Sequence, residues 1–147
     1  MNNLMDQSNK AKKVRTTSNG WMIQRIAKRL NDRMEQRLAV LDLSTQHFPV
    51  MMTVLENDGL TQTEIGGKFG MPSYAISRAL DHLEAKGALE RRQHPTSRRT
   101  HTIHATEVGQ KLAPQLFEIV RLLNEELVSD LSVQEREMFQ KILTKLV

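Results

Sequence analysis

Arginine and histidine side chains that could bind a polyanion gather in one segment of the chain. Residues 91–104 hold four arginines and three histidines, and no acid interrupts them. Guanidinium groups pair with phosphates and enter DNA grooves, where the negative potential is concentrated. This local excess of positive charge favours a nucleic-acid partner over an ordinary solvated surface when a DNA-binding element precedes it.

Such an element precedes it, at residues 72–86. Ser73, Tyr74, Ser77 and Arg78 recur at a spacing that places them on one face of a helix. Arg78 can pair with the O6 and N7 atoms of guanine, and Tyr74 can meet a thymine methyl group. The two serines can contact bases or phosphates. We therefore predict that this helix reads the DNA major groove.

The flanking residues predict how this helix is held. Thr61 and Glu64 form a capping box that begins a short helix, and Gly70 ends it. Pro72 suits the first turn of the next helix, and Gly87 suits its end. Residues 88–93 and 100–104 then predict a β-hairpin. The result is a helix-turn-helix followed by a basic wing.

The tip of this wing should form a second contact with DNA. Arg98 and Arg99 are adjacent, so in a strand they would point in opposite directions, one toward the minor groove and the other toward the domain. Phosphates should be held by Thr61, Gln62, Arg91 or Arg92. The residues expected to contact DNA are Thr61, Gln62, Ser73, Tyr74, Ser77, Arg78, Arg91, Arg92, Thr96, Ser97, Arg98 and Arg99.

The rest of the chain is predicted to be helical. Residues 1–19 read as a flexible basic arm, and a helix over residues 21–41 should follow a cap at Ser18 or Asn19. Ser44 or Thr45 should cap a strongly apolar second helix that ends at residues 57–59. Ile65 and Phe69 should face the core, together with a buried stripe on the following helix formed by Ile76, Ala79, Leu80 and Leu83. Thr106 should cap a helix that runs to about residue 129, and Ser132 with Glu135 forms a second capping box.

Composition narrows the class of protein. The chain has 147 residues, a net charge of +4 and no cysteine, which excludes disulfides and thiolate metal sites. It has no membrane-spanning apolar run and no signal peptide, so we expect a cytoplasmic protein without a membrane partner. No phosphate-binding glycine loop or catalytic triad has supporting context, so we expect no enzyme activity and no cofactor. His101 and His104 should lie on opposite strand faces without a carboxylate partner, so no metal site is expected.

The segment LTQTEIGGKFGMPSYAISRALDHLEAKGALERR, with SRRTHTIHATEVGQ after it, resembles the winged-helix core of the MarR family of transcriptional regulators. The resemblance covers residues 20–147. It implies a mainly α fold with a small β-hairpin wing, flanked by N- and C-terminal dimerisation helices. It places residues 44–104 in the DNA-binding core and residues 20–43 and 105–147 in dimerisation helices. Arg99 matches the wing-tip arginine of the family, and Ser77-Arg78 matches a pair on its recognition helix.

Two positions depart from the family pattern. Ser97 stands where the family usually has an aspartate that anchors the wing arginine, and a serine can hydrogen-bond that arginine but cannot neutralise it. Gly66 and Gly67 stand where alanine is usual. Each glycine costs a helix about 0.5–1 kcal/mol relative to alanine, so this helix either packs closely on a neighbour or is locally soft.

The resemblance also implies partners. Family members bind pseudo-palindromic DNA as homodimers, and many release it when a small aromatic or phenolic acid binds between the dimerisation and DNA-binding regions. Trp21, Arg25, His47 and Met51 are the candidates for holding such an effector here, and ordinary core or surface roles for them stay open. The apolar residues of the last two helices fit dimerisation, intramolecular packing against the first helix, or both.

We therefore expect a sequence-specific transcriptional regulator that binds double-stranded DNA as a homodimer and acts as a ligand-responsive repressor. Two alternatives stay open. One is a dimeric protein-interaction module of the same fold that has lost sequence-specific binding. The other is a DNA-binding protein that has no small-molecule effector.

Overall fold

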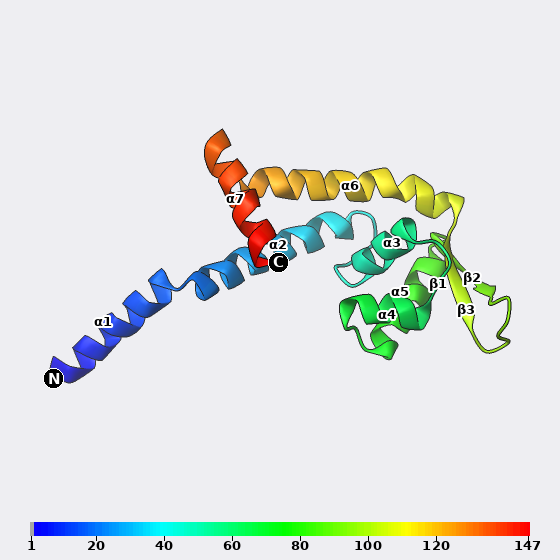
Figure 1. Ribbon diagram of the computed structural model, residues 1–147, viewed down its shortest axis with the longest axis horizontal. Coiled ribbons are helices and arrows are strands. Elements are labelled where there is room, and N and C mark those ends of the chain that lie inside the picture. The colour runs from blue at the N-terminus through cyan, green and yellow to red at the C-terminus, as the bar shows by residue number, and fades with distance from the viewer. Residues whose placement is uncertain (1) are drawn as a thin grey trace. The chain divides into compact units, whose positions relative to one another are not determined.

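The structure is a computed structural model that describes the backbone of residues 2–147 and the side chains from residue 4 onward. It contains seven helices and three short strands within that range (Figure 1). Their bounds are α1 Asn2–Thr17, α2 Asn19–Ala39, α3 His47–Glu56, β1 Leu60–Thr61, α4 Gln62–Phe69, α5 Ser73–Ala85, β2 Leu89–Gln93, β3 His101–Ala105, α6 Glu107–Leu127 and α7 Val133–Leu146. The mainly α fold with a small β-hairpin is confirmed. None of the described helices is long and apolar enough to cross a membrane.

The chain divides into two compact units, Met1–Arg33 and Met34–Val147. The first unit holds α1 and most of α2. Ser18 separates the two helices, and its Oγ accepts the Trp21 N–H at 3.2 Å, so the predicted cap at Ser18 is confirmed. Residues 2–17 form a helix where an irregular arm was expected. That part of the prediction is wrong, because propensity over several basic and polar residues was enough to favour a helix.

The second unit contains a three-stranded antiparallel sheet with the order β1-β3-β2. Ile103 in β3 pairs with Leu60 on one side and with Arg91 on the other. Strand β1 has only two residues and was not predicted. It places the start of α4 directly beside the hairpin, because Thr61 is both the last residue of β1 and the N-cap of α4.

One hydrophobic core joins the helices of the second unit to the sheet. The predicted stripe on α5 is buried, and Ile65 from α4 lies against it with no exposed surface. Side chains at every third or fourth position of α6 close the other side of the core; these are Leu112, Leu116, Ile119 and Leu123. Phe69 was expected to face this core, but 42% of its surface is exposed. The prediction is wrong because α4 ends at Phe69, where the chain already turns away.

Local signals set most helix ends. Both predicted capping boxes are present, at Thr61 with Glu64 and at Ser132 with Glu135, and Thr106 caps α6. Helix α3 is the exception. It begins after Gln46, which makes no side-chain cap, so the caps expected at Ser44 or Thr45 are wrong. Ser44 Oγ instead accepts the N–H of Gln46 at 3.2 Å, one residue before the helix begins.

Two glycines permit close contacts between elements. A Cβ atom on Gly109 would lie 2.1 Å from the carbonyl oxygen of Ala88 and 2.9 Å from the Met51 Cε, so the start of α6 fits against β2 only without a side chain. A Cβ atom on Gly66 would lie 3.3 Å from Ile76 Cγ1. Gly66 therefore lets α4 approach α5. The sequence left open whether the glycine pair serves close packing or makes the helix locally soft, and close packing applies to Gly66.

We predict that Gly109→Ala lowers the free energy of unfolding by at least about 1–3 kcal/mol, because the new methyl group meets a backbone carbonyl that cannot move freely. Gly67→Ala is the matched control. A Cβ atom there meets nothing within 4 Å, so this change should stabilise the protein by about 0.5–1 kcal/mol. Urea unfolding of both variants measures these changes. Equal effects of the two substitutions would contradict the close contact at Gly109.

Candidate nucleic-acid interface

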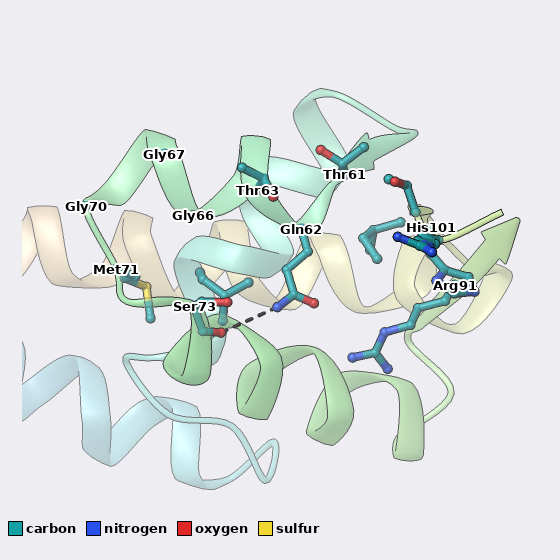
Figure 2. A pocket seen from close by; sticks show the side chains of 14 residues that line it. Thr61, Gln62, Thr63, Gly66, Gly67, Gly70, Met71, Ser73, Arg91 and His101 are labelled. Atoms are coloured by element: carbon teal, nitrogen blue, oxygen red, sulfur yellow. Dashed lines mark hydrogen bonds between the residues drawn. The ribbon is translucent and has the colours of Figure 1, made fainter. Parts of the chain in front are cut away.

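The turn between α4 and α5 sets the angle at which α5 is presented. Gly70 ends α4 in the left-handed conformation, with φ of 60°, and Pro72 occupies the N-cap position of α5. The Gln62 side chain spans the two helices, since its Nε2 donates to the carbonyl oxygen of Ser73 at 3.4 Å (Figure 2). Together with the close approach at Gly66, these features hold α4 and α5 as a helix-turn-helix.

An open groove of about 650 Å³ lies between this helix-turn-helix and the wing (Figure 2). Three separate elements line it: α4, the start of α5 and the strands of the hairpin. Five of the residues expected to contact DNA line this groove, namely Thr61, Gln62, Ser73, Arg91 and Arg99. The structure thus brings together residues that lie up to 38 positions apart in the sequence.

The expected reading face of α5 is available to a partner. Ser73, Tyr74 and Arg78 are exposed and Ser77 is half-buried. The Arg78 guanidinium carbon lies 5.9 Å from the centroid of the Tyr74 ring, a cation–π contact that orients the arginine along the helix surface. Within the described residues no carboxylate lies within ion-pair distance of Arg78. Its guanidinium donors are free for a partner.

The wing tip is held without a carboxylate. Gln93 Nε2 donates to the carbonyl oxygen of Ser97 at 2.7 Å, and the hydroxyls of Ser97 and Thr100 lie 2.9 Å apart. Ser97 therefore hydrogen-bonds Thr100, and its expected bond to the wing arginine is absent. Arg98 and Arg99 lie in a turn, so the strand alternation expected for them does not apply. Both are exposed, as is Thr96.

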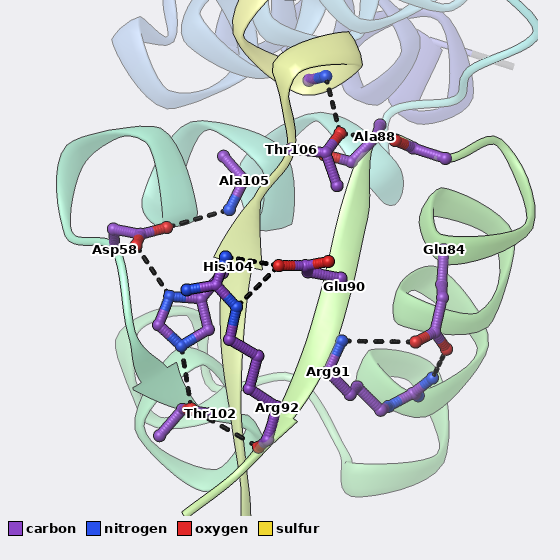
Figure 3. Close-up of polar contacts among 12 residues, drawn as sticks. Asp58, Glu84, Ala88, Glu90, Arg91, Arg92, Thr102, His104, Ala105 and Thr106 are labelled. Atoms are coloured by element: carbon purple, nitrogen blue, oxygen red, sulfur yellow. Dashed lines mark hydrogen bonds and ion pairs between the residues drawn. The ribbon is translucent and has the colours of Figure 1, made fainter.

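Arg91 joins the wing to α5. Its guanidinium donates to Asp81 Oδ1 at 2.7 Å. It also pairs with the Glu84 carboxylate, and the Arg91 backbone N–H donates to Glu84 at 3.3 Å (Figure 3). Burial acts to lower the pKa of Arg91, but its hydrogen bonds to Asp81 and Glu84 outweigh burial and hold this pKa above its usual value. Sequence reasoning had assigned Arg91 to phosphates and missed this contact.

Arg92 points to the opposite side of β2 and pairs with Glu90 (Figure 3). Because 57% of its side chain is exposed, the guanidinium keeps donors free for a second partner. Its assignment to phosphates stays a prediction.

A second network ties β3 to the loop before β1. Asp58 accepts hydrogen bonds from His104 Nδ1 at 2.7 Å and from the Ala105 N–H at 2.8 Å, and His104 Nε2 lies 2.8 Å from the Thr102 hydroxyl (Figure 3). Burial of Asp58 acts to raise its pKa, but the hydrogen bonds from His104 and Ala105 outweigh burial and lower this pKa. The expectation that His104 has no carboxylate partner is wrong. Within the described part of the chain, no three His, Cys, Asp or Glu side chains are placed to hold a metal ion.

With this geometry in place, the chain can be compared with known proteins. Residues 41–100 match the model of the MarR family. This match covers 60 of the 147 residues, and over them the chain is similar to the MarR family.

Solved structures of MarR-family regulators share the fold. MarR from E. coli in its reduced form is 24% identical, with a TM-score of 0.82 over 88% of this chain and 96% of that chain. A mutant E. coli MarR complexed with operator DNA is 24% identical, with a TM-score of 0.74 over 87% and 92%. The transcriptional repressor CouR, bound to a 23-mer DNA duplex, is 23% identical, with a TM-score of 0.78 over 89% and 93%. At these identities the likeness establishes the fold.

Neither unit contains all four of the effector candidates that the MarR resemblance suggested. Trp21 and Arg25 belong to residues 1–33, where the Arg25 guanidinium carbon lies 4.8 Å from the centroid of the Trp21 ring. His47 and Met51 belong to the second unit. Met51 has no exposed surface and packs in the core, so its side chain is not available to a ligand.

His47 takes part in a different contact, with α5. Its ring stacks on that of His82 in α5, with the ring centroids 4.1 Å apart and the planes 4° from parallel. His47 Nδ1 lies 3.0 Å from the Ser44 backbone nitrogen, so it accepts that N–H and is unprotonated, while His82 Nε2 lies 2.7 Å from the Asp42 carbonyl oxygen. Burial, with a smaller contribution from His82, lowers the pKa of His47. The stack therefore needs a neutral His47.

We predict that the Arg91 contact contributes to stability. A double-mutant cycle with Arg91→Gln and Glu84→Gln should give a coupling free energy of about 1–2 kcal/mol, because Arg91 is mostly buried and is bound by two carboxylates. The matched cycle uses Lys111→Gln and Glu107→Gln, an exposed pair on α6, and should give about 0.3–0.5 kcal/mol. Chemical denaturation measures both. Coupling no larger at Arg91 than at Lys111 would contradict the structural role.

We also predict a pH dependence that comes from His47. Its pKa in the folded protein lies below the ordinary histidine value of 6.5, so as the pH falls below that value the unfolded chain takes up a proton that the folded chain does not. The free energy of unfolding should therefore fall between about pH 7.5 and 5.5, and by less in His47→Gln than in the parent protein. His101→Gln, at an exposed position of β3, is the control and should follow the parent. Identical pH profiles for all three proteins would contradict the prediction.

Proposed function

We propose that this chain is a sequence-specific DNA-binding transcriptional regulator of the MarR family, which binds pseudo-palindromic operators as a dimer and represses in a ligand-responsive way. The observation that carries the proposal is the groove between the helix-turn-helix and the wing. Ser73 at the start of α5 and Arg99 of the wing tip line it, and the exposed Arg78 lies farther along α5, outside the lining. A helix beside a basic hairpin fits a major groove and the minor groove next to it.

In this proposal α5 enters the major groove. Arg78 would pair with guanine, Ser73 and Ser77 would contact bases or phosphates, and Tyr74, which is 67% exposed, would meet a thymine methyl group. Thr61 and Gln62 lie at the N-terminus of α4, where the helix dipole favours a phosphate. Arg92 would hold a further phosphate. Arg91 would act through its contact with α5.

At the wing, Arg98 or Arg99 would enter the minor groove, with Thr96 and Ser97 beside the backbone. Arg99 is the better placed of the two, because it lines the groove that faces α5. The hydrogen bonds of Gln93 and Thr100 hold Ser97, which stands at the position of the family aspartate, and leave the wing arginines without this anchor. A wing tip of this kind carries an arginine charge that no acid offsets within the tip.

The dimer is supported by apolar surface on the last two helices. Helix α7 has no buried residue, and its exposed apolar side chains include Met138, Ile142, Leu143 and Leu146. Phe117 on α6 is also 52% exposed. Apolar surface of this extent in a soluble chain is typical of an interface between copies. A two-fold dimer would place its half-sites about one helical turn apart, on the order of 10 base pairs.

A small aromatic or phenolic acid remains the proposed effector. The second unit has an apolar depression of about 430 Å³ between the end of α2 and α6, lined by Leu41, Pro114 and Ile119, with Arg37 and Glu118 also in its lining. The apolar walls suit an aromatic ring, and the carboxylate of such a ligand would compete with Glu126 for Arg37. Thermal unfolding and DNA binding with a panel of aromatic acids test this part. No shift in either would favour a DNA-binding protein without an effector.

The proposal as a whole is tested by selecting bound sequences from random DNA. Binding of the selected duplex and of a random duplex of equal length is then titrated against salt. A two-fold symmetric consensus, bound at least about 10³-fold more tightly than random DNA, is the expected result. Equal and weak binding to both duplexes, abolished by about 200 mM salt, would instead favour a protein-interaction module of the same fold.

We predict that Arg78→Ala weakens binding to the selected duplex by about 1–3 kcal/mol and relaxes specificity at one position in each half-site. The reason is that the substitution removes a bidentate pairing with one guanine. Lys111→Ala, on the exposed side of α6, is the control and should leave the consensus unchanged. Fluorescence anisotropy with single-base variants of the duplex measures both. A uniform weakening across all sequences would make Arg78 a phosphate contact instead.

A further inference from the structure

The net positive charge of the protein comes from its first unit. Residues 1–33 contain eight lysines and arginines and two acids, a formal net charge of +6. Residues 34–147 contain 13 lysines and arginines and 15 acids, a formal net charge of −2. The unit that carries the recognition helix and the wing thus contributes none of the protein's net charge of +4. A positive field concentrated in one short unit favours an anionic partner for that unit.

Helix α1 carries four of these cations, Lys10, Lys12, Lys13 and Arg15, and all its described side chains are exposed. Exposed helices usually offset their charges with acids three or four residues away, as Lys111 and Glu107 do on α6. In the described residues of the first unit, the ion pair is between Lys28 and Asp32 on α2, and α1 has none. Its single acid, Asp6, makes no ion pair among the described residues, so α1 carries a net charge of +3 from four cations and one acid.

The cations of α1 are also held in place on a helix. Arg15, near its end, lies with its guanidinium carbon 5.5 Å from the centroid of the Trp21 ring, and Arg25 of α2 lies 4.8 Å from the same ring. The cap at Ser18 fixes the start of α2 between them. A 16-residue helix is about 24 Å long, which corresponds to about seven base pairs of duplex DNA.

We propose that α1 binds the phosphate backbone of duplex DNA outside the half-site contacted by α5, as a second, sequence-independent contact. Lys10 and Lys13 lie on one side of the helix and Lys12 and Arg15 on the other, so no single face is shaped to read base edges. Lysine acts on phosphate as a point charge, which suits this role. The inference rests on the proposed function, since it assigns the first unit to the same DNA.

The test uses a triple variant, Lys10→Gln with Lys12→Gln and Lys13→Gln, in the full chain. Glutamine has a helix propensity close to that of lysine, and circular dichroism checks that helicity is kept. The matched control replaces the same three lysines with arginine, which keeps the charge. Binding is measured against salt on two duplexes: the selected sequence trimmed to its two half-sites, and the same sequence extended by about 15 base pairs on each side.

On the extended duplex, the slope of log Kobs against log salt should become shallower by about 0.9 for each phosphate that the variant no longer neutralises, or by roughly 2.7 per protomer. The advantage of the parent over the triple variant should then shrink by roughly 40-fold per protomer between 50 and 200 mM salt. On the trimmed duplex the parent and the variant should share one slope, and the arginine control should follow the parent on both.

Equal slopes for the parent and the triple variant on the extended duplex would overturn the inference and leave α1 a solubilising helix. A variant that no longer binds phosphatidylserine vesicles while keeping the parent's slope on DNA would overturn it in favour of a lipid surface. The proposed function fails separately, if the parent shows no preference for selected over random DNA. A shallower slope of the variant on random DNA would support the DNA contact by α1 even then.

Discussion

The contact of Arg91 with Asp81 and Glu84 is the interaction on which the candidate interface depends. The helix α5 and the wing are separate elements that both pack on the core, and Arg91 joins them directly. Arg91 lies in β2, and both of its partners lie on the α5 side that faces the hairpin. Because a mostly buried guanidinium bound by two carboxylates favours one geometry, this contact restrains the distance between helix and wing. The groove between them follows from that distance.

Two further contacts fix the other sides of the wing. Asp58 holds β3 through His104 and Ala105, and the absence of a side chain at Gly109 lets α6 meet Ala88, the residue before β2. The wing is thus tied to the loop before β1, to α5 and to α6. Its tip is left with side-chain and backbone hydrogen bonds of its own. This arrangement places rigidity at the base of the hairpin and exposed arginines at its end.

Signals within a few residues of one another were readable from the sequence. Both capping boxes, the glycines after α4 and α5, and the buried stripe on α5 depend on neighbours along the chain, and all are confirmed. Such features need no knowledge of tertiary packing. The reading face of α5 followed from the same periodicity, so its exposure was predictable as well.

Contacts between residues that are far apart in the sequence could not be predicted from it. Asp58 and His104 are 46 positions apart, and nothing local indicates that the loop before β1 meets β3. Arg91 looked like one more cation in a basic segment until the hairpin brought it against two acids of α5. The helical state of residues 2–17 was missed for the opposite reason. Their polarity suggested an arm, although polarity does not prevent lysine and glutamine from forming a helix.

The measurement that tests the central claim most directly removes the acids that hold Arg91. In the double variant Asp81→Asn with Glu84→Gln, two negative charges disappear beside the proposed DNA surface, so electrostatics alone would strengthen binding to every duplex. If these acids position the wing, the ratio of selected to random affinity must fall at constant salt, even where random binding becomes tighter. An unchanged ratio, with affinity rising equally on both duplexes, would contradict the account.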